Sequence, residues 1–311
     1  MKDALPNPGV SRRRPRTAYK TALGRMIVGD TSAVLRSKRM DDHKGKVQLV
    51  FTSPPFPLNR KKAYGNLNGQ AYVGWLQSFA PRFREYLTTD GSIVLELGNS
   101  WEHGQPTMST LGLRALLAFL KEGDLHLCQQ FVCYNPARLP SPVQWVNIDR
   151  SRVKDSFTHV WWMSPVPRPK ADNRAVVTPY RPGMVELLRT KDYNSGKRPS
   201  EHGIGPRSFL KDNGGAIPPN VLTYTNTQSN DPYQRFCRDN GIRPHPARMP
   251  AGLVDFFVRF LTSEGDLVLD PFAGSNTTGA VAEKLGRRWL AVEANDDYVE
   301  GSRGRFLRQD A

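Results

Sequence analysis

The sequence has only three cysteines, Cys128, Cys133 and Cys237, and it contains no CxxC pair. An odd number without that spacing argues against a disulfide framework and against a zinc site. The six histidines form no HExxH pattern, so no metal ion is expected. The thiols are expected to be buried and free, as cysteines usually are in a reducing compartment.

Long apolar runs are also missing, because no stretch of roughly 18 uncharged apolar residues occurs, and this argues against a transmembrane helix. The N-terminus, Met-Lys-Asp-Ala-Leu-Pro, lacks the apolar stretch of a signal peptide. A cytoplasmic location without a membrane partner is therefore expected. The 311 residues, 38% of them hydrophobic, suffice for one large α/β domain with a smaller insert or for two modest domains.

Acidic residues are few relative to basic ones, since 29 Asp and Glu stand against 44 Lys and Arg and give a net charge of +15. Residues 1–20 form a basic arm that is expected to be flexible, and two further basic clusters lie at residues 60–62 and 303–308. A distributed positive charge favours nucleic acid as the partner, ahead of an anionic membrane. For the arm taken alone, a solvated tail that aids solubility is the alternative.

Residues 21–163 alternate between predicted strands and predicted helices. Buried strands are predicted at 47–51, 92–97 and 158–163, with a turn at Asp90-Gly91. Apolar residues at helical spacing predict one amphipathic helix from Tyr72 to Leu87 and another around residues 113–120. This alternation favours an α/β fold with a doubly wound, mostly parallel sheet.

Residues 164–244 differ in composition, since twelve of the 25 prolines lie between Pro165 and Pro246. Such a stretch cannot form a long regular layer, and we predict a loop-rich insert. Regular structure returns in residues 245–311, with helices predicted at 253–261 and 276–285 and strands at 266–270 and 288–293. The main domain is therefore expected in two parts, 21–163 and 245–311, which the insert separates.

A glycine loop follows the predicted strand at 266–270 and opens the next helix. Glycine allows the backbone to approach a ligand closely, and a helix N-terminus offers free N–H groups. Glu293 ends the following strand, 23 positions after Asp270, where an acid is placed to accept hydrogen bonds from ribose hydroxyls. The candidate cofactor-binding residues are Asp270, Pro271, Phe272, Gly274, Ser275, Asn276, Thr277 and Glu293.

The same loop differs from an ATP-binding P-loop. Gly274 and Gly279 have the P-loop spacing, but Ala280 and Val281 follow where that motif requires Lys-Ser/Thr. With no lysine to pair with phosphates, we expect an adenosine that carries a carboxylate-and-amine tail rather than a triphosphate. An ordinary strand–turn–helix without a ligand is the alternative.

The second constellation is Ser53-Pro54-Pro55-Phe56, directly after the strand at 47–51. Active sites in open α/β sheets lie at the carboxyl ends of strands, and two prolines make the loop rigid and remove two N–H donors. Ser53 Oγ and the Pro54 carbonyl can accept hydrogen bonds from an exocyclic amine on a base, while Phe56 stacks on that base. Acceptors outside the ring plane restore the lone pair of the nitrogen for attack on a methyl sulfonium, and the transfer then needs mainly alignment. A rigid turn without chemistry is the alternative.

Glu96 lies within the otherwise apolar strand at 92–97. Glutamate is rarely buried without a partner, so a functional contact is one interpretation. In that interpretation Glu96 accepts a hydrogen bond from Ser53 and later takes up the released proton. A solvent-facing residue on an edge strand is the alternative.

The order of these two loops resembles the β-class amino-methyltransferases of bacterial restriction–modification systems, in which an S/N/D-P-P-aromatic motif precedes the cofactor loop. Residues 152–163, 211–220 and 245–250 also resemble family segments, so the resemblance runs from about Ala22 to Leu307. It implies a Rossmann-like methyltransferase fold in permuted order, with S-adenosylmethionine as the cofactor and double-stranded DNA as the substrate.

In this family a serine-first motif usually goes with cytosine N4, and aspartate- or asparagine-first versions usually go with adenine N6. The resemblance therefore implies a site-specific cytosine-N4 DNA methyltransferase of a restriction–modification system. An adenine-N6 enzyme and a non-catalytic DNA-binding relative are the alternatives. It also implies that His245 and Pro246 lie over the methionine end of the cofactor and that Asp30 approaches the adenine. Glu96 is a departure, because relatives carry the shorter aspartate there, which weakens the expected contact with Ser53.

The resemblance assigns the insert at 164–244 to target recognition. Polar side chains in it that would read base edges or contact phosphates are Arg181, Lys197, Arg198, Arg207, Lys211, Asn213 and Asn220. Each of them taken singly is also typical of an ordinary surface. The target base would be flipped into a pocket lined by the Ser53 loop. The implied partners are DNA and a cognate restriction endonuclease, and the chain would act as a monomer or a homodimer.

Overall fold

The computed structural model describes residues 14–56, 69–225 and 231–307. They fall into two compact units, a larger one formed by the described residues of 1–170 and 220–311 and a smaller one at 171–219. The strands of the larger unit are β1 (Arg16–Lys20), β2 (Gly24–Val28), β3 (Val47–Thr52), β4 (Leu87–Gly98), β5 (His126–Tyr134), β6 (Phe157–Ser164), β9 (Val221–Thr223), β10 (Leu267–Asp270) and β11 (Arg288–Glu293). Its helices are α1 (Thr31–Leu35), η1 (Lys38–His43), α2 (Gly69–Gln77), α3 (Ala80–Tyr86), α4 (Leu111–Gly123), η2 (Gln144–Ile148), α6 (Pro232–Asp239), α7 (Ala251–Leu261), α8 (Thr277–Lys284), α9 (Asp296–Ser302) and η4 (Arg303–Arg305).

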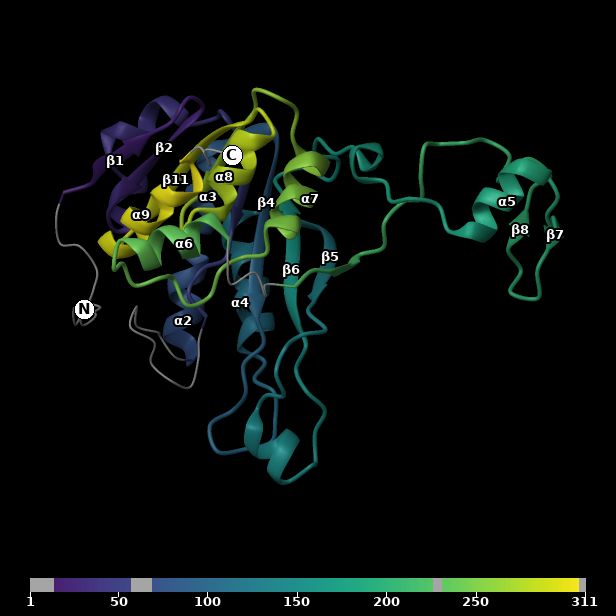
Figure 1. Cartoon of the computed structure of the whole chain (residues 1–311), viewed down its shortest axis with the longest axis horizontal. Helices are drawn as coiled ribbons and strands as arrows, with labels where there is room; N and C mark the ends of the chain where they lie inside the picture. Colours follow the sequence, from purple (N-terminus) through teal and green to yellow (C-terminus); the bar gives the residue numbers. More distant parts are fainter. Residues whose placement is uncertain (1–13, 57–68, 226–230, 308–311) are drawn as a thin grey trace. The chain divides into compact units, whose positions relative to one another are not determined.

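The nine strands form one sheet in the order β1-β2-β11-β10-β3-β4-β6-β5-β9. Figure 1 labels β1, β2, β11, β4, β6 and β5 of this sheet. The five strands from β2 to β4 in this order are parallel to one another. β6 is antiparallel to both β4 and β5, and β1 is antiparallel to β2. The mostly parallel α/β sheet expected from the sequence is therefore present, and β4 and β5 run in the same direction.

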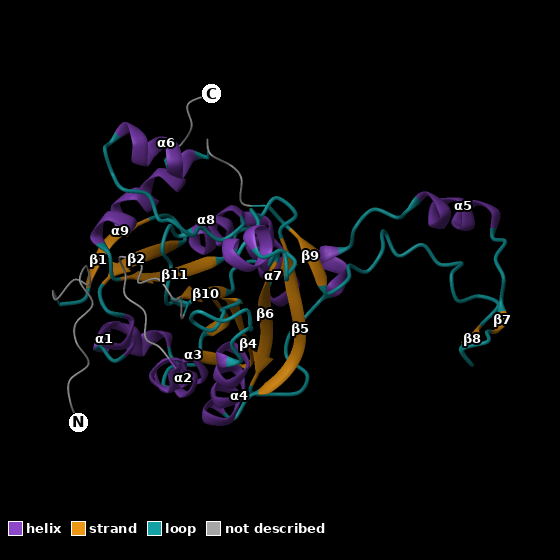
Figure 2. Ribbon diagram, turned by 90° about the horizontal axis from the view of Figure 1, so that it is seen from below, coloured by secondary structure: helices purple, strands orange, loops and turns teal. Residues whose placement is uncertain are grey.

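Helices cover both faces of this sheet, with α1, α2 and α4 on one side and α7, α8 and α9 on the other (Figure 2). Because successive side chains of a strand point to opposite sides, each strand contributes side chains to both faces of the sheet. Leu267 and Leu269 belong to the core under α1 to α4, and Val268 between them is fully buried but outside that cluster. Burial on both faces explains why β3 and β10 are mostly apolar and do not alternate between apolar and polar residues.

The helix predicted from Tyr72 to Leu87 is in fact two helices, α2 and α3. The prediction was wrong because α3 carries a proline in its first turn, Pro81. Proline lacks the N–H that would continue the α2 hydrogen-bond ladder, and its ring clashes with the carbonyl four residues earlier. The apolar periodicity continues across the break, since Leu76, Phe79 and Phe83 all lie in the core.

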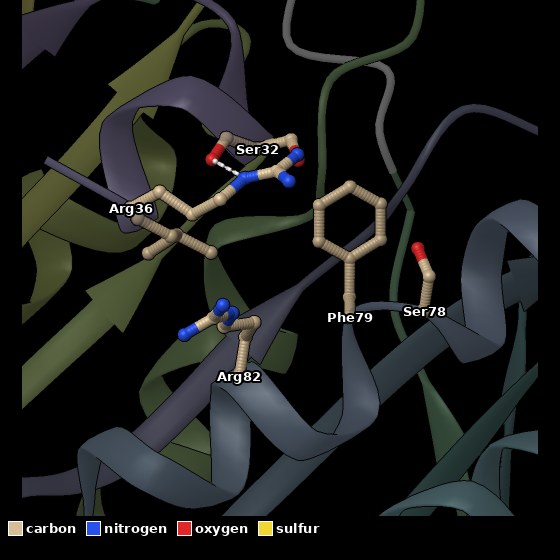
Figure 3. A pocket seen from close by; sticks show the side chains of 6 residues that line it. Ser32, Arg36, Ser78, Phe79 and Arg82 are labelled. Atoms are coloured by element: carbon tan, nitrogen blue, oxygen red, sulfur yellow. Dashed lines mark hydrogen bonds between the residues drawn. The ribbon is translucent and has the colours of Figure 1, made fainter.

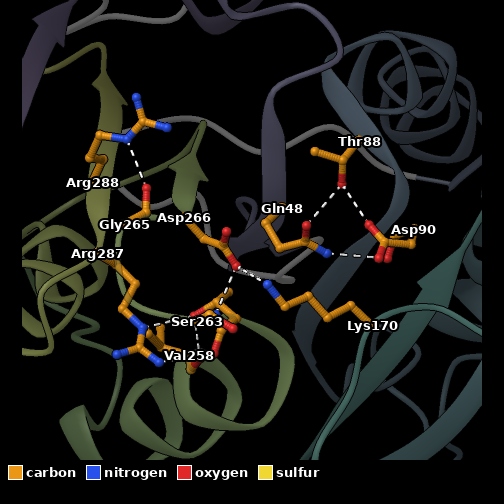
Figure 4. A network of polar contacts seen from close by, with 11 residues as sticks. Gln48, Thr88, Asp90, Lys170, Val258, Ser263, Gly265, Asp266, Arg287 and Arg288 are labelled. Atoms are coloured by element: carbon orange, nitrogen blue, oxygen red, sulfur yellow. Dashed lines mark hydrogen bonds and ion pairs between the residues drawn. The ribbon is translucent and has the colours of Figure 1, made fainter.

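The turn predicted at Asp90-Gly91 is also corrected, because both residues lie inside β4. Val47 pairs with Leu87 and Leu49 pairs with Ser92, so that four residues of β4 bulge opposite the single residue Gln48. Polar contacts hold this bulge (Figure 4). Gln48 Nε2 donates to the Asp90 carbonyl at 3.2 Å, and Thr88 Oγ1 donates to Gln48 Oε1 at 3.0 Å. Lys170, which also bonds to the Asp90 carbonyl through its backbone N–H, pairs with Asp266 at 2.6 Å.

The basic arm is shorter than expected. Residues 1–13 lie outside the described residues, as do 60–62 of the second basic cluster, but Arg16–Lys20 is strand β1 and not a flexible segment. Tyr19 explains this difference, because it is buried and its hydroxyl bonds to Ser302 Oγ at 2.5 Å.

The smaller unit, 171–219, contains η3 (Asn173–Val176), α5 (Pro182–Thr190) and a two-stranded ribbon of β7 (Gly196–Lys197) and β8 (Gly203–Ile204). A bridge between Thr178 and Ala216 closes it, and the rings of Tyr193 and Phe209 pack 5.5 Å apart. This unit is shorter than the predicted insert at 164–244. Within the described ranges, no helix has the length and apolar character needed to cross a membrane.

Candidate active site

The Ser53-Pro54-Pro55-Phe56 loop leaves the carboxyl end of β3 in the centre of the sheet. Pro54 is buried, and Ser53 and Phe56 are half-buried. The Phe56 ring lies against the end of β4, where a Cβ on Gly98 would come within 2.5 Å of it. Glycine at 98 therefore makes room for the aromatic side chain that the sequence predicts to stack on a base.

Glu96 reaches this loop from β4. Its carboxylate is hydrogen-bonded to the Ser53 side chain and accepts a second hydrogen bond from Thr158 Oγ1 at 2.9 Å. Burial raises the pKa of Glu96, while the bonds from Thr158 and Ser53 and the nearby positive charge of Arg138 act to lower it. The solvent-facing alternative is wrong, because Glu96 is buried in an interior strand. The family pattern has the shorter aspartate at this position. The longer side chain of Glu96 makes the expected contact with Ser53 all the same.

Thr158 and Arg138 were not predicted to take part in the site. Thr158 stands on β6 opposite Gly98, and only the pairing of β4 with β6 brings it to Glu96. Arg138 follows β5, and its guanidinium is held by a 3.0 Å bond to the carbonyl of Phe157. Thr158 lies within the segment 152–163 that resembles the family, but nothing in that resemblance pointed to its contact with Glu96, and Arg138 has no motif around it.

Asp270 ties the two loops together at the end of β10. Its Oδ1 accepts from Thr52 Oγ1 at 2.6 Å and from the Phe272 backbone N–H at 3.1 Å, while its Oδ2 accepts from Thr278 Oγ1 at 2.6 Å. Burial raises the pKa of Asp270 to about 6. Since Thr52 directly precedes Ser53, the buried carboxylate fixes the glycine loop relative to the Ser53 loop.

Glu293, at the end of β11, reaches the same loop. Its Oε2 accepts from the Gly274 N–H at 2.8 Å and its Oε1 from the Asn295 N–H at 2.9 Å. Burial raises the pKa of Glu293 as well. The Gly29 N–H donates to the Glu293 carbonyl at 2.9 Å. The next residue, Asp30, is exposed and caps α1 through the Ala33 N–H at 2.9 Å. Asp30 and Glu293 are thus brought to one end of the sheet, and their contacts with a cofactor stay predictions.

Gly274 and His245 are also brought together. Gly274 has φ = 50°, and a Cβ there would lie 3.1 Å from His245 Nε2. The His245 ring packs edge-on against Tyr298 at 4.6 Å, and its backbone N–H donates to the Tyr233 hydroxyl at 2.6 Å. The segment after the insert therefore folds back over the glycine loop, while Pro246 is exposed.

Other predicted cofactor residues use their side chains within the protein. Asn276 is fully buried, caps α8 through the Gly279 N–H at 3.1 Å, and donates to the Tyr19 hydroxyl at 3.1 Å. Ser275 Oγ and Thr277 Oγ1 are 3.3 Å apart, and both residues are buried. Thr31 Oγ1 donates to the Pro271 carbonyl at 2.6 Å. Any contact of these residues with a cofactor stays a prediction.

The basic cluster predicted at 303–308 is not a free positive surface in its described part. Arg305 donates to the Ser275 carbonyl at 2.6 Å and to Ser275 Oγ at 3.0 Å, and burial lowers its pKa. Arg303 lies over the Tyr19 ring at 4.8 Å and pairs with Glu300 at 2.8 Å. These charges support the glycine loop and its neighbours, which a run of arginines in a sequence does not reveal.

Phe272 belongs to an aromatic wall beside the loop. Its ring lies 5.5 Å from Trp75 and 5.3 Å from Phe79. Phe79 also lines a groove of about 210 Å³ between α1 and α3, with Ser32, Leu35, Arg36, Ser78 and Arg82 (Figure 3). The Arg36 Nε donates to the Ser32 carbonyl at 3.1 Å.

The predicted DNA-binding side chains Arg181, Lys197, Arg198, Arg207, Lys211 and Asn213 all belong to the smaller unit. All are exposed except Arg198, which is half-buried. This unit carries eight Lys and Arg against five Asp and Glu. Asn220, by contrast, belongs to the larger unit, where its side chain donates to the Gln130 carbonyl at 2.9 Å.

Comparison with known proteins gives consistent matches. Residues 47–303 match the N6/N4 family model described as DNA methylase. The chain is 45% identical over 292 residues to the type II methyltransferase M.PvuII of Proteus hauseri. This alignment covers 93% of this chain and 85% of that protein. The solved structure of the PvuII DNA methyltransferase (cytosine-N4-specific) superposes with a TM-score of 0.75 at 38% identity, over 95% of this chain and 90% of that one. The M1.HpyAVI–SAM complex, at 16% identity and a TM-score of 0.55 over 92% of this chain and 100% of that one, shares the fold.

Proposed function

The chain belongs to the N6/N4 family of DNA methylases, and from this premise we propose that it methylates N4 of a cytosine at a specific site in double-stranded DNA. One observation carries the proposal. Ser53, which would accept from the target amine, is bonded to Glu96, and the adjacent Thr52 is bonded to the buried Asp270 of the glycine loop. The amine site and the cofactor loop are thus parts of one rigid assembly.

The residues of the glycine loop fit S-adenosylmethionine. Glu293 offers carboxylate oxygens of the kind that ribose hydroxyls bind, and Asp30 offers another exposed carboxylate nearby. Gly274 is buried beneath His245, where even a Cβ would come within 3.1 Å of the ring, so glycine keeps the loop free of a side chain there. The glycine loop carries no lysine of the kind that holds phosphates in a P-loop. When bound, S-adenosylmethionine supplies an electrophilic methyl group.

The chain's own residues then handle the target amine and its proton. Ser53 Oγ and the Pro54 carbonyl accept hydrogen bonds from the amine and orient its lone pair. Glu96 receives the proton through Ser53, and its raised pKa makes it a better proton acceptor than an exposed carboxylate. Thr158 donates to Glu96 Oε1 and so helps to fix the carboxylate beside Ser53. Phe56 supplies the aromatic face on which the extruded base stacks.

The test is to incubate the purified full chain with methyl-labelled S-adenosylmethionine and mixed genomic DNA, and to identify the labelled nucleoside by mass spectrometry. N4-methylcytosine is the expected product. N6-methyladenine would overturn the base assignment and keep the site. Absence of label on any DNA, together with absence of cofactor binding, would leave the non-catalytic DNA-binding alternative.

We further infer that the smaller unit recognises the target sequence and that a restriction endonuclease acts on the same site. Exposed basic and amide side chains in the smaller unit support its role in recognition. A cytoplasmic location and a monomeric or homodimeric state remain part of this proposal. Protection of methylated DNA against a panel of endonucleases tests whether an endonuclease acts on the same site, and light scattering on the full chain tests the assembly.

A further inference from the structure

Two loops at the catalytic edge of the sheet join into a projection that we call the edge lobe, residues 99–110 and 135–156. The first loop follows β4, and the second follows β5. Because β4 and β5 are both antiparallel to β6, they run in the same direction as β3 and end at the same edge as Ser53. The lobe extends well beyond the sheet at the bottom of Figure 1. It belongs to the larger unit.

Internal bonds hold the lobe together. At its base, Asn99 Nδ2 donates to Asp155 Oδ1 at 2.8 Å, and farther out Arg152 Nε donates to the Pro106 carbonyl at 3.0 Å. The Trp145 carbonyl accepts the backbone N–H groups of Ser151 and Arg152 at 2.9 and 3.1 Å. The two loops therefore form one preformed element rather than two independent segments.

Large apolar side chains are exposed on this lobe. Ile148, the last residue of η2, is 65% exposed, and the other exposed members are Met108, Leu139, Val143 and Val153. Single exposed apolar residues need no explanation, but a group on one projecting element indicates a binding surface.

Positive charge accompanies these apolar side chains. Arg150, two residues after Ile148, has φ = 49° and makes no hydrogen bond or ion pair with any of the described residues. It lines an open hollow of about 570 Å³ with Val146, Asn147 and Arg152. The lobe has four basic residues, Arg138, Arg150, Arg152 and Lys154, against three acidic ones, Glu102, Asp149 and Asp155. Glu102 is exposed, whereas Asp149 accepts from Gln144 at 2.8 Å and Asp155 from Asn99 at 2.8 Å.

We propose that the edge lobe docks on the DNA duplex at the target site, with Ile148 inserted beside the target base and Arg150 on a phosphate. The proposal rests on the proposed function, because a base whose amine reaches Ser53 has to leave the stack. Apolar wedges next to basic side chains are how proteins unstack a base step. Charge complementarity favours DNA over a second copy of this chain, which carries a net charge of +15.

The experiment compares single-turnover methylation by wild type and Ile148→Ser on two duplexes, one with the target cytosine paired to guanine and one with it mispaired. Leu117→Ser is the matched control, because Leu117 is 67% exposed on α4, away from the lobe. We expect Ile148→Ser to lower the rate about tenfold or more on the paired duplex and about threefold or less on the mispaired one, because a mispaired base is easier to extrude. Leu117→Ser should match wild type on both.

A second arm measures binding to the paired duplex over a range of salt. Arg150→Ala should reduce the slope of log affinity against log salt by about 1 in magnitude, as expected for one lost phosphate contact, and Arg114→Ala on α4 should not. Equal rates for Ile148→Ser and wild type on both duplexes would overturn the proposal. So would a dimer that Ile148→Ser converts to a monomer with normal rates, since the lobe would then be an interface between copies. Wild type that binds DNA without methylating it would overturn the proposed function alone, and the salt arm would still test the lobe.

Discussion

Replacing Thr158 by valine removes the hydroxyl that donates to Glu96 Oε1 at 2.9 Å and keeps the shape of the side chain. Because Glu96 is buried, water cannot replace the lost donor. The hydrogen bond with Ser53 is then the one remaining side-chain hydrogen bond that lowers the pKa of Glu96. The variant therefore isolates the positioning of the carboxylate without touching the target amine.

The magnitude follows from the strength of a hydrogen bond to a charged group, about 1.5–3 kcal/mol. If the whole of this free energy is lost from the transition state in which the amine gives up its proton, the methylation rate falls by roughly 10- to 100-fold. The sign of the pH effect is also fixed. The Thr158 bond lowers the pKa of Glu96, so its loss raises that pKa, and the ionised carboxylate is present only at higher pH. The acidic limb of the kcat/KM profile should move to higher pH.

The assay is single-turnover methylation of a duplex containing the site, from about pH 5 to pH 9, with cofactor binding measured in parallel. Thr158→Ser keeps the donor and should retain the wild-type profile. A valine variant that loses activity with an unmoved acidic limb would refute the role of Thr158 in setting the pKa of Glu96. Unchanged activity at every pH would refute the positioning role itself.

Three further predictions concern the glycine loop and the smaller unit. Gly274→Ala should weaken cofactor binding about tenfold or more in calorimetry, because its Cβ would press on His245. Gly265 also has a positive φ but has open space around it, so Gly265→Ala should not weaken binding. Equal losses in the two variants would mean that backbone strain alone is responsible. Asp270 has a pKa raised from 3.8 to about 6, so between these values the folded state holds a proton that the unfolded state has lost. The contribution of this group to the free energy of unfolding therefore falls by on the order of 3 kcal/mol as the pH rises to 6. Urea unfolding of Asp270→Asn should lack that fall, and an unchanged pH slope would contradict the assignment. Lys211→Ala should lower the affinity for cognate and non-cognate DNA alike and reduce the salt slope by about 1, and an effect confined to cognate DNA would instead mean that Lys211 reads a base.

The sequence by itself determined the two loops and their chemistry. A strand that ends in Ser-Pro-Pro-Phe and another that ends in Asp-Pro-Phe-Ala-Gly are local patterns, since proline and glycine restrict or free the backbone wherever they stand. The sheet strands at 47–51, 266–270 and 288–293 were predicted to within one residue because each is a short, mostly apolar segment. The acid at Glu293 followed from spacing along the chain.

Only the tertiary structure decided what surrounds those loops. Thr158 meets Glu96 because β6 pairs antiparallel with β4, and Arg305 meets Ser275 because the C-terminal η4 folds back to the glycine loop. Contacts between residues so far apart along the chain depend on strand order and packing, and no local pattern encodes them. The same reason explains why the arginines near the C-terminus were predicted to form a positive surface and why the sequence did not predict the edge lobe. Exposure and partners are properties of the folded chain, whereas residue type and spacing are properties of the sequence.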